Sequence, residues 1–140
     1  MKNLLLLVLI AFSFTCLAQN NDQKQIDELL DSQKKAWNEG NINEYMDGYW
    51  KSDSLRFIGK NGITYGWEAT LERYEKSYPD KSAMGKLNFD ILSKEPLGKE
   101  HYLITGKWTI TESTSDASGY FSLVMKKINK KWCIIYDHSS

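Results

Sequence analysis

The sequence predicts a single α+β domain in which about three helices cover one face of a curved antiparallel sheet. Apolar residues recur with helical spacing in the first half of the chain, whereas they alternate with polar residues over about the last sixty positions. No internal repeat, low-complexity segment or Pro- and Gly-rich linker divides the 140 residues, a length that suits one domain. Helices followed by long strands are typical of the α+β class.

Residues 1–18 have the layout of a secretory signal peptide, and residues 19–140 are expected to form the domain. Lys2 supplies the positive start, an apolar run extends from Leu4 to Phe12, and Cys16-Leu17-Ala18 places small residues where a signal peptidase reads them. A membrane-spanning helix needs about 20 apolar residues, and this run has about half of that number. We therefore expect an exported protein, periplasmic or secreted, with no membrane segment after cleavage.

Cleavage is expected directly before Gln19. The alternative is a lipoprotein anchored through Cys16, which the bulky Phe14 in front of the cysteine disfavours. Cleavage also removes one of the two cysteines, so Cys133 is left alone in an apolar stretch and no intrachain disulfide can form. We expect Cys133 to belong to the core rather than to act as a reactive thiol.

The composition of the mature segment argues against several functions. Removal of residues 1–18 takes one base and no acid from the 18 basic and 18 acidic residues, which leaves a formal charge of −1. Binding to nucleic acid usually needs a basic excess, so it is not expected. No metal site is expected, because His101 and His138 are far apart and Cys133 has no partner. No cofactor is expected either, since the segment 59–62 is typical of a hairpin rather than a phosphate loop.

Three helices are predicted in the first half of the domain. Residues 21–39 repeat apolar side chains at helical spacing. Gly40 is expected to end this helix, and Asn41 to cap a second, shorter one. A third helix is expected from Trp67 to just before Pro79, because proline disfavours the helical conformation in the residue that precedes it.

Strands are predicted for the rest of the domain. A hairpin is expected at residues 54–65, around the pair Asn61-Gly62. Alternating apolar and polar residues then predict four long strands around residues 87–91, 102–110, 120–128 and 131–138, joined by turns. These four strands are expected to form an antiparallel meander.

With its elements in this order, the chain from about Gln25 to Ser140 resembles the NTF2-like superfamily of cone-shaped domains, and within it the DUF4440 or SnoaL-like group. The segments that carry the resemblance are Ala36 to Asn41, Tyr49 to Ser54, Ile63 to Ala69, and Lys131 to Ser140. The last of these, with its ending Asp-His-Ser-Ser, is the most specific.

The resemblance implies a cone with a cavity and a homodimer formed through the sheets, but it does not imply one activity. The fold hosts isomerases, cyclases, dehydratases, binding modules and association domains. Ketosteroid isomerase uses a carboxylate base and a Tyr of an oxyanion hole. The matching positions here hold Ile58 or Gly59 for the base and Gln33 for the Tyr. That isomerase chemistry is therefore not expected.

The candidate ligand-pocket residues are one amide and seven aromatic residues. They are Gln33, Trp37, Tyr49, Trp50, Phe57, Tyr65, Trp108 and Tyr136. Aromatic side chains line most small-molecule pockets, although aromatic stripes are also typical of an ordinary core. Gln33 lies on the apolar stripe of the first helix, where its amide bonds either a ligand or the nearby backbone.

Asp137 and His138 are the candidate catalytic residues. Period-two alternation places them on opposite faces of the last strand, His138 on the face of Ile134 and Asp137 on the face of Cys133. At most one of the two can then line a cavity if the strand is regular. Such a residue is either an acid–base group or polar anchor, or a structural group that bonds to the backbone or closes the sheet edge.

Two classes of function stay open. The favoured hypothesis is a non-catalytic exported domain that binds a small apolar or amphipathic molecule in the cone cavity, or that associates as a dimer. The alternative is a SnoaL-like enzyme that uses acid–base chemistry on a small organic substrate. The later strands carry apolar residues on both faces, for example Leu103 beside Ile104 and Leu123 beside Val124. This pattern predicts a homodimer packed through the sheet.

Overall fold

The computed structural model describes the backbone of residues 2–140 and the side chains of residues 21–140. The elements are, in chain order, α1 (Lys2–Glu39), α2 (Ile42–Met46), β1 (Arg56–Gly59), β2 (Gly62–Tyr65), α3 (Trp67–Ser77), α4 (Lys81–Met84), β3 (Lys86–Pro96), β4 (His101–Thr111), β5 (Ala117–Ile128) and β6 (Lys131–Ser139). The predicted signal peptide, residues 1–18, lies outside the residues whose side chains are described, so its cleavage stays a prediction. Within the described part, no helix combines the length and the apolar character that crossing a membrane requires.

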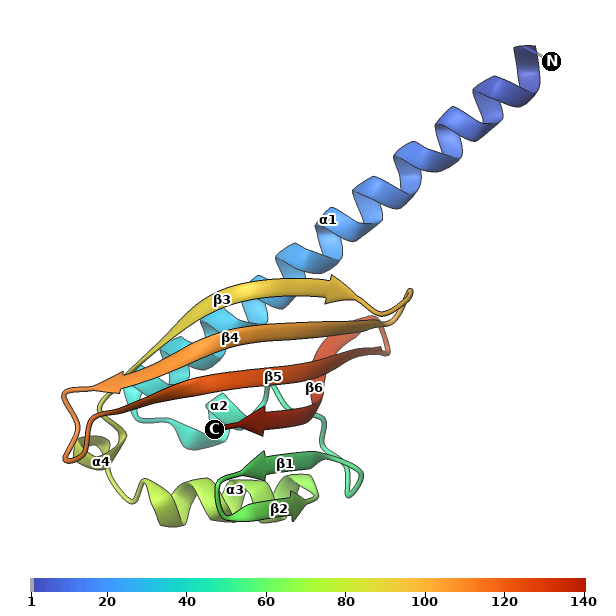
Figure 1. Ribbon diagram of the computed structural model, residues 1–140. Helices are drawn as coiled ribbons and strands as arrows, with labels where there is room; N and C mark the ends of the chain where they lie inside the picture. The colour runs from blue at the N-terminus through green and yellow to red at the C-terminus, as the bar shows by residue number, and fades with distance from the viewer. Residues whose placement is uncertain (1) are drawn as a thin grey trace.

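The six strands form one curved sheet in the order β2-β1-β6-β5-β4-β3 (Figure 1). The strands β3 to β6 are a meander of long antiparallel neighbours, as predicted. In contrast, β1 runs parallel to β6, with Phe57 opposite Asp137. The expectation of a purely antiparallel sheet is therefore wrong at this pair. The two strands come from opposite ends of the domain and enter the sheet in the same direction, which residue alternation within each strand does not reveal.

In the view of Figure 1, the later part of α1 and α2 lie behind the long strands, and α3 runs beside the β1–β2 hairpin. Gly40 follows the end of α1 with a φ of 83°, a conformation that glycine adopts without strain. The side chain of Asn41 caps α2 by accepting a hydrogen bond from the Glu44 backbone N–H at 3.1 Å. The prediction missed α4, which is too short to show helical periodicity. Asp80 caps it by accepting from the Ala83 N–H at 2.8 Å.

Contacts at both ends of the described part of α1 fix this helix across the sheet. Near its start, Asp22 pairs with Lys127 of β5 at 2.6 Å. Near its end, the ring of Trp37 packs edge-on against Tyr78, with centroids 4.7 Å apart. The indole Nε1 of Trp37 also donates to the Met84 carbonyl at 3.0 Å. The helix is thereby held over the inner face of the sheet.

Candidate functional site

A cavity of about 380 Å³ lies between the helices and the inner face of the sheet. Most of its wall is apolar and is formed by Leu30, Trp37, Phe57, Leu87, Phe89, Trp108, Ile110, Phe121, Leu123 and Ile134. Polar side chains reach it from several elements, among them Gln33, Tyr45, Tyr49, Arg73, Tyr74, Asp137 and Ser139. Apolar walls with a few convergent polar groups are typical of a small-molecule site.

A β-bulge in β6 turns Asp137 toward this cavity. Two successive residues of β5 pair with Ile134 and Tyr136, so Ile135 between them is an extra residue without a partner. An extra residue moves every later side chain of the strand to the other face. Asp137 is consequently 3% exposed and faces inward with Ile134, whereas Tyr136 is 38% exposed.

The bulge also decides where the second candidate catalytic residue lies. His138 is exposed and does not line the cavity, while Asp137 does. The expectation that His138 shares a face with Ile134, and Asp137 with Cys133, is wrong because it assumed a regular strand. The two side chains do point to opposite faces, but each points to the face expected of the other.

Both oxygens of the Asp137 carboxyl group accept hydrogen bonds from hydroxyl groups. Tyr49 Oη donates to Oδ2 and Ser139 Oγ donates to Oδ1, each at 2.7 Å. The Tyr49 hydroxyl belongs to a cluster with the hydroxyls of Tyr45 and Tyr74, in which the three oxygens are 3.4 to 3.5 Å apart. Helices α2 and α3, strand β6 and the segment that follows α2 thus bring four hydroxyl groups and one carboxyl group together at the cavity wall.

Burial controls the ionisation of this cluster. It raises the pKa of Asp137, although the hydrogen bonds from Tyr49 and Ser139 and the charge of Arg73 act in the opposite direction. Burial also raises the pKa of Tyr45 to about 12, and it raises the pKa values of Tyr49 and Tyr74 well above 10.0. At neutral pH the three tyrosines therefore carry their protons and can donate hydrogen bonds. Asp137 holds a proton more readily than an exposed aspartate does.

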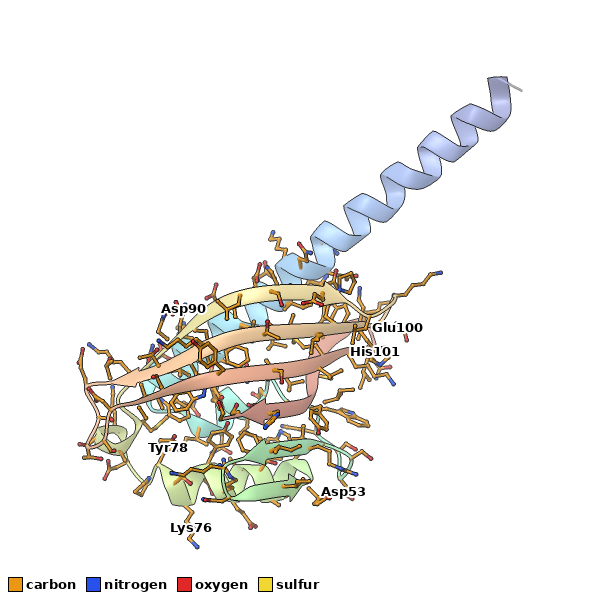
Figure 2. All side chains as sticks on the ribbon, in the orientation of Figure 1. Asp53, Lys76, Tyr78, Asp90, Glu100 and His101 are labelled. Carbon is orange, nitrogen blue, oxygen red and sulfur yellow. The ribbon has the colours of Figure 1, made fainter. Side chains whose placement is uncertain are left out.

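Helix α3 brings a positive charge to the cavity. Arg73, Tyr74 and Tyr78 line it, whereas Lys76 points from the same helix away from the sheet (Figure 2). The guanidinium carbon of Arg73 lies 4.1 Å from the centroid of the Phe57 ring. This distance is within the range of a favourable cation–π contact.

Gln33 is 2% exposed and lies on the cavity wall. Its amide Nε2 donates to the backbone carbonyl of Tyr45 at 3.0 Å. The side chain packs so close to Gly48 that a Cβ atom there would lie 2.6 Å from the amide carbon. The Gln33 amide therefore bonds to the backbone within the protein, and this hydrogen bond helps to hold α2 against α1.

The cavity brings together five of the eight pocket residues predicted from the sequence: Gln33, Trp37, Tyr49, Phe57 and Trp108. Trp50, Tyr65 and Tyr136 do not line it. Tyr65 lies on the edge strand β2 and is 59% exposed, and the bulge turns Tyr136 outward. Trp50 follows Tyr49 directly and is half-buried outside the cavity.

Sequence reasoning did not select several residues of the site. Tyr45 and Tyr74 lie on the apolar faces of predicted helices. This pattern indicates that they are buried, but it does not distinguish a pocket residue from a core residue. Arg73 and Ser139 gave no such signal. Among residues 21–140, no group of three or more His, Cys, Asp or Glu side chains is arranged to hold a metal ion. His101 lies at the turn between β3 and β4, far from α3 (Figure 2).

Comparisons with known proteins place this geometry in a family. No protein-family model matches the chain, and no curated protein matches it. Among solved structures, an NTF-2-like protein of unknown function from Shewanella oneidensis is 36% identical, with a TM-score of 0.81, over 85% of this chain and 98% of that one. An NTF2-like superfamily protein from Salmonella enterica is 20% identical, with a TM-score of 0.64, over 90% and 92% of the two chains.

A ketosteroid isomerase-like protein from Erwinia carotovora shares the fold as well. It is 11% identical, with a TM-score of 0.65, over 82% of this chain and 92% of that chain. At this identity the likeness concerns the fold alone. The 36% identity along nearly the whole Shewanella protein is a stronger relation, and the chain therefore belongs to the NTF2-like family.

Proposed function

We propose that the domain binds a small, largely apolar molecule with at least one polar group in the cavity between the helices and the sheet. The cavity itself carries this proposal. Protein interiors are usually close-packed, yet aromatic and aliphatic side chains here leave about 380 Å³ unfilled. Small-molecule sites have volumes of roughly 300–1,000 Å³ and mostly apolar walls.

The tyrosine cluster gives the proposed site its polar specificity. The Tyr49 hydroxyl donates its hydrogen bond to Asp137, while the hydroxyls of Tyr45 and Tyr74 are 3.4 to 3.5 Å from their neighbours and make only long contacts. These two hydroxyls are donors that a carbonyl or hydroxyl group of a ligand can engage. A ligand without such a group would leave them poorly satisfied, which favours a molecule with a polar end.

A neutral fluorescent probe tests the proposal. Nile red is expected to gain fluorescence with the wild-type protein and to lose it with Leu123→Trp, which fills the cavity with a larger side chain. Leu92→Trp is the matched control, because Leu92 is 63% exposed on β3 and does not line the cavity. Circular dichroism checks that both variants fold. Equal binding by both folded variants would show that the probe does not enter the cavity.

A second candidate is an enzyme that uses acid–base chemistry on a small organic substrate, and Asp137 is the observation that favours it. A buried carboxyl group with a raised pKa on a cavity wall is suited to proton transfer with a bound substrate. Gly59, one of the two positions matched to the carboxylate base of ketosteroid isomerase, lines the same cavity but has no side chain. Asp137 would therefore act without a second carboxylate. Isomerisation of a β,γ-unsaturated ketone, followed by absorbance, tests this candidate. A wild-type rate no higher than that of Asp137→Asn counts against it.

We also propose that the domain is exported and forms a homodimer through the outer face of its sheet. On that face Leu103, Val124 and Tyr136 lie side by side on neighbouring strands. Tyr120 is an exposed aromatic residue of the same strand β5. Light scattering at tens of micromolar is expected to give the mass of a dimer for the wild type and of a monomer for Val124→Glu. A monomeric wild type would contradict the proposal.

A further inference from the structure

Arg73 is a half-buried cation on the cavity wall that has no counter-ion. Two other partly buried cations are paired, Lys94 with Asp27 at 2.7 Å and Lys127 with Asp22 at 2.6 Å. Among residues 21–140, no carboxylate lies within ion-pair distance of Arg73. Nor does its guanidinium donate a hydrogen bond to any group in that part of the chain.

The position of the guanidinium is built into the fold rather than left to a free side chain. Its carbon lies over the ring of Phe57, 4.1 Å from the ring centroid. A Cβ atom on Gly59 would lie 2.9 Å from its Nη2 atom and 3.0 Å from Phe57 Cε1. Gly59 does not have a positive φ, so the reason for a glycine here is space. The missing side chain leaves room for the guanidinium over the ring beside the cavity.

The charges around the cavity favour an anion near Arg73. The lining side chains include two cations, Lys60 and Arg73, and a single carboxyl group, Asp137. Asp137 already accepts two hydrogen bonds, from Tyr49 and Ser139, and does not pair with the arginine. The side chains alone would carry a net positive charge, but the terminal carboxyl group of Ser140 belongs to the same lining. An anion is therefore favoured by the unpaired guanidinium of Arg73 rather than by the net charge of the cavity.

We infer that the ligand of the cavity is an amphipathic anion, a small apolar molecule with one carboxylate group that binds to Arg73. This inference rests on the proposed binding function and names the chemical class of the ligand. The planar guanidinium presents paired N–H donors that match both oxygens of a carboxylate. The apolar body lies along the aromatic wall, and the stacking on Phe57 holds the donors in place.

Binding of matched acids and amides tests the inference. The probes are 4-phenylbutyrate, indole-3-butyrate and decanoate, each compared with its primary amide, which has nearly the same shape but no charge. Isothermal titration calorimetry at neutral pH gives the dissociation constants for the wild type, Arg73→Gln and Arg56→Gln. Arg56 is the matched control, because it also stacks on an aromatic ring, that of Tyr65 at 4.5 Å, but does not line the cavity.

The wild type and Arg56→Gln are expected to bind at least one acid roughly tenfold more tightly than its amide, as a charge-assisted hydrogen bond provides. In Arg73→Gln the two affinities are expected to become equal, with the melting temperature close to that of the wild type. Equal affinities in the wild type would overturn the carboxylate inference and leave the proposed binding function intact. An acid preference that survives Arg73→Gln would overturn it too. If no acid and no amide binds the wild type, both proposals fail.

Discussion

Replacement of Asp137 by asparagine separates the charge of this buried side chain from its shape. In the native network Tyr49 donates to one carboxyl oxygen and Ser139 to the other, at 2.7 Å each. An asparagine oxygen can accept the bond from Tyr49, and its NH₂ group can donate to Ser139 Oγ, so both contacts persist. Asp137→Ala instead leaves the buried Tyr49 hydroxyl without its acceptor, which costs about 1–3 kcal/mol of the free energy of unfolding.

The asparagine variant should change how stability depends on pH. Burial raises the pKa of Asp137 in the folded protein above its ordinary value of 3.8, so the folded state holds the proton more tightly than the unfolded state. This stabilisation is complete below the ordinary pKa and is lost as the pH rises through the folded pKa. Within that window the free energy of unfolding of the wild type falls by at most about 1.4 kcal/mol per pH unit. The stability of Asp137→Asn relative to the wild type should therefore increase with pH.

Urea denaturation from about pH 3 to about pH 8 measures this difference. Asp90→Asn is the matched control, because Asp90 is exposed on the sheet (Figure 2) and its replacement removes one carboxylate without touching the cavity. The reasoning is refuted if the wild type gains stability over Asp137→Asn as the pH rises. That outcome would mean that the hydrogen bonds and the charge of Arg73 outweigh burial and lower the folded pKa.

Three further predictions concern other parts of the chain. Asp22→Ala removes the partly buried ion pair with Lys127 and should lower the free energy of unfolding by about 1–2 kcal/mol in urea denaturation; no change would mean that this end of α1 is not held by the pair. Gly48→Ala places a Cβ atom 2.6 Å from the buried side chain of Gln33 and should cost about 1–3 kcal/mol, and an unchanged melting temperature would contradict this packing. N-terminal analysis of the exported protein should begin at or next to Gln19, and finding Met1 on it would contradict the signal peptide.

Most of the fold could be predicted because its signals are local. Helical spacing, with Gly40, Asn41 and Pro79 as boundary signals, located α2, α3 and the end of α1, although α1 begins before the predicted residue 21. Alternation located the four long strands. The parallel pairing of β1 with β6 could not be predicted in this way, since it joins segments about eighty positions apart and neither strand alone encodes its direction. The resemblance supplied the cone, but it did not distinguish the mixed sheet from an antiparallel one.

The candidate site was harder to predict because it depends on exact side-chain direction. One unpaired residue, Ile135, reverses the faces of Asp137 and His138, and nothing in the apolar stretch around it marks the bulge. Arg73 lies close in sequence to Glu72, Glu75 and Lys76, a density of charge typical of a solvated helix face. Its place on the cavity wall depends on a second element, where Gly59 leaves space for the guanidinium.

Arg73 and Asp137 line one cavity with opposite charges, yet the fold keeps them apart. The arginine is held over Phe57 on the side of α3, and the carboxyl group is held by Tyr49 and Ser139. A direct ion pair would use up the donors of one group and the acceptors of the other. Because Arg73 and Asp137 do not form an ion pair, the N–H donors of the guanidinium stay free to bind a ligand. At the same time it still moderates the pKa of the carboxyl group through space. A bound anion that neutralises Arg73 would weaken the effect by which the arginine lowers the pKa of Asp137. Anion binding and protonation of Asp137 should therefore favour each other.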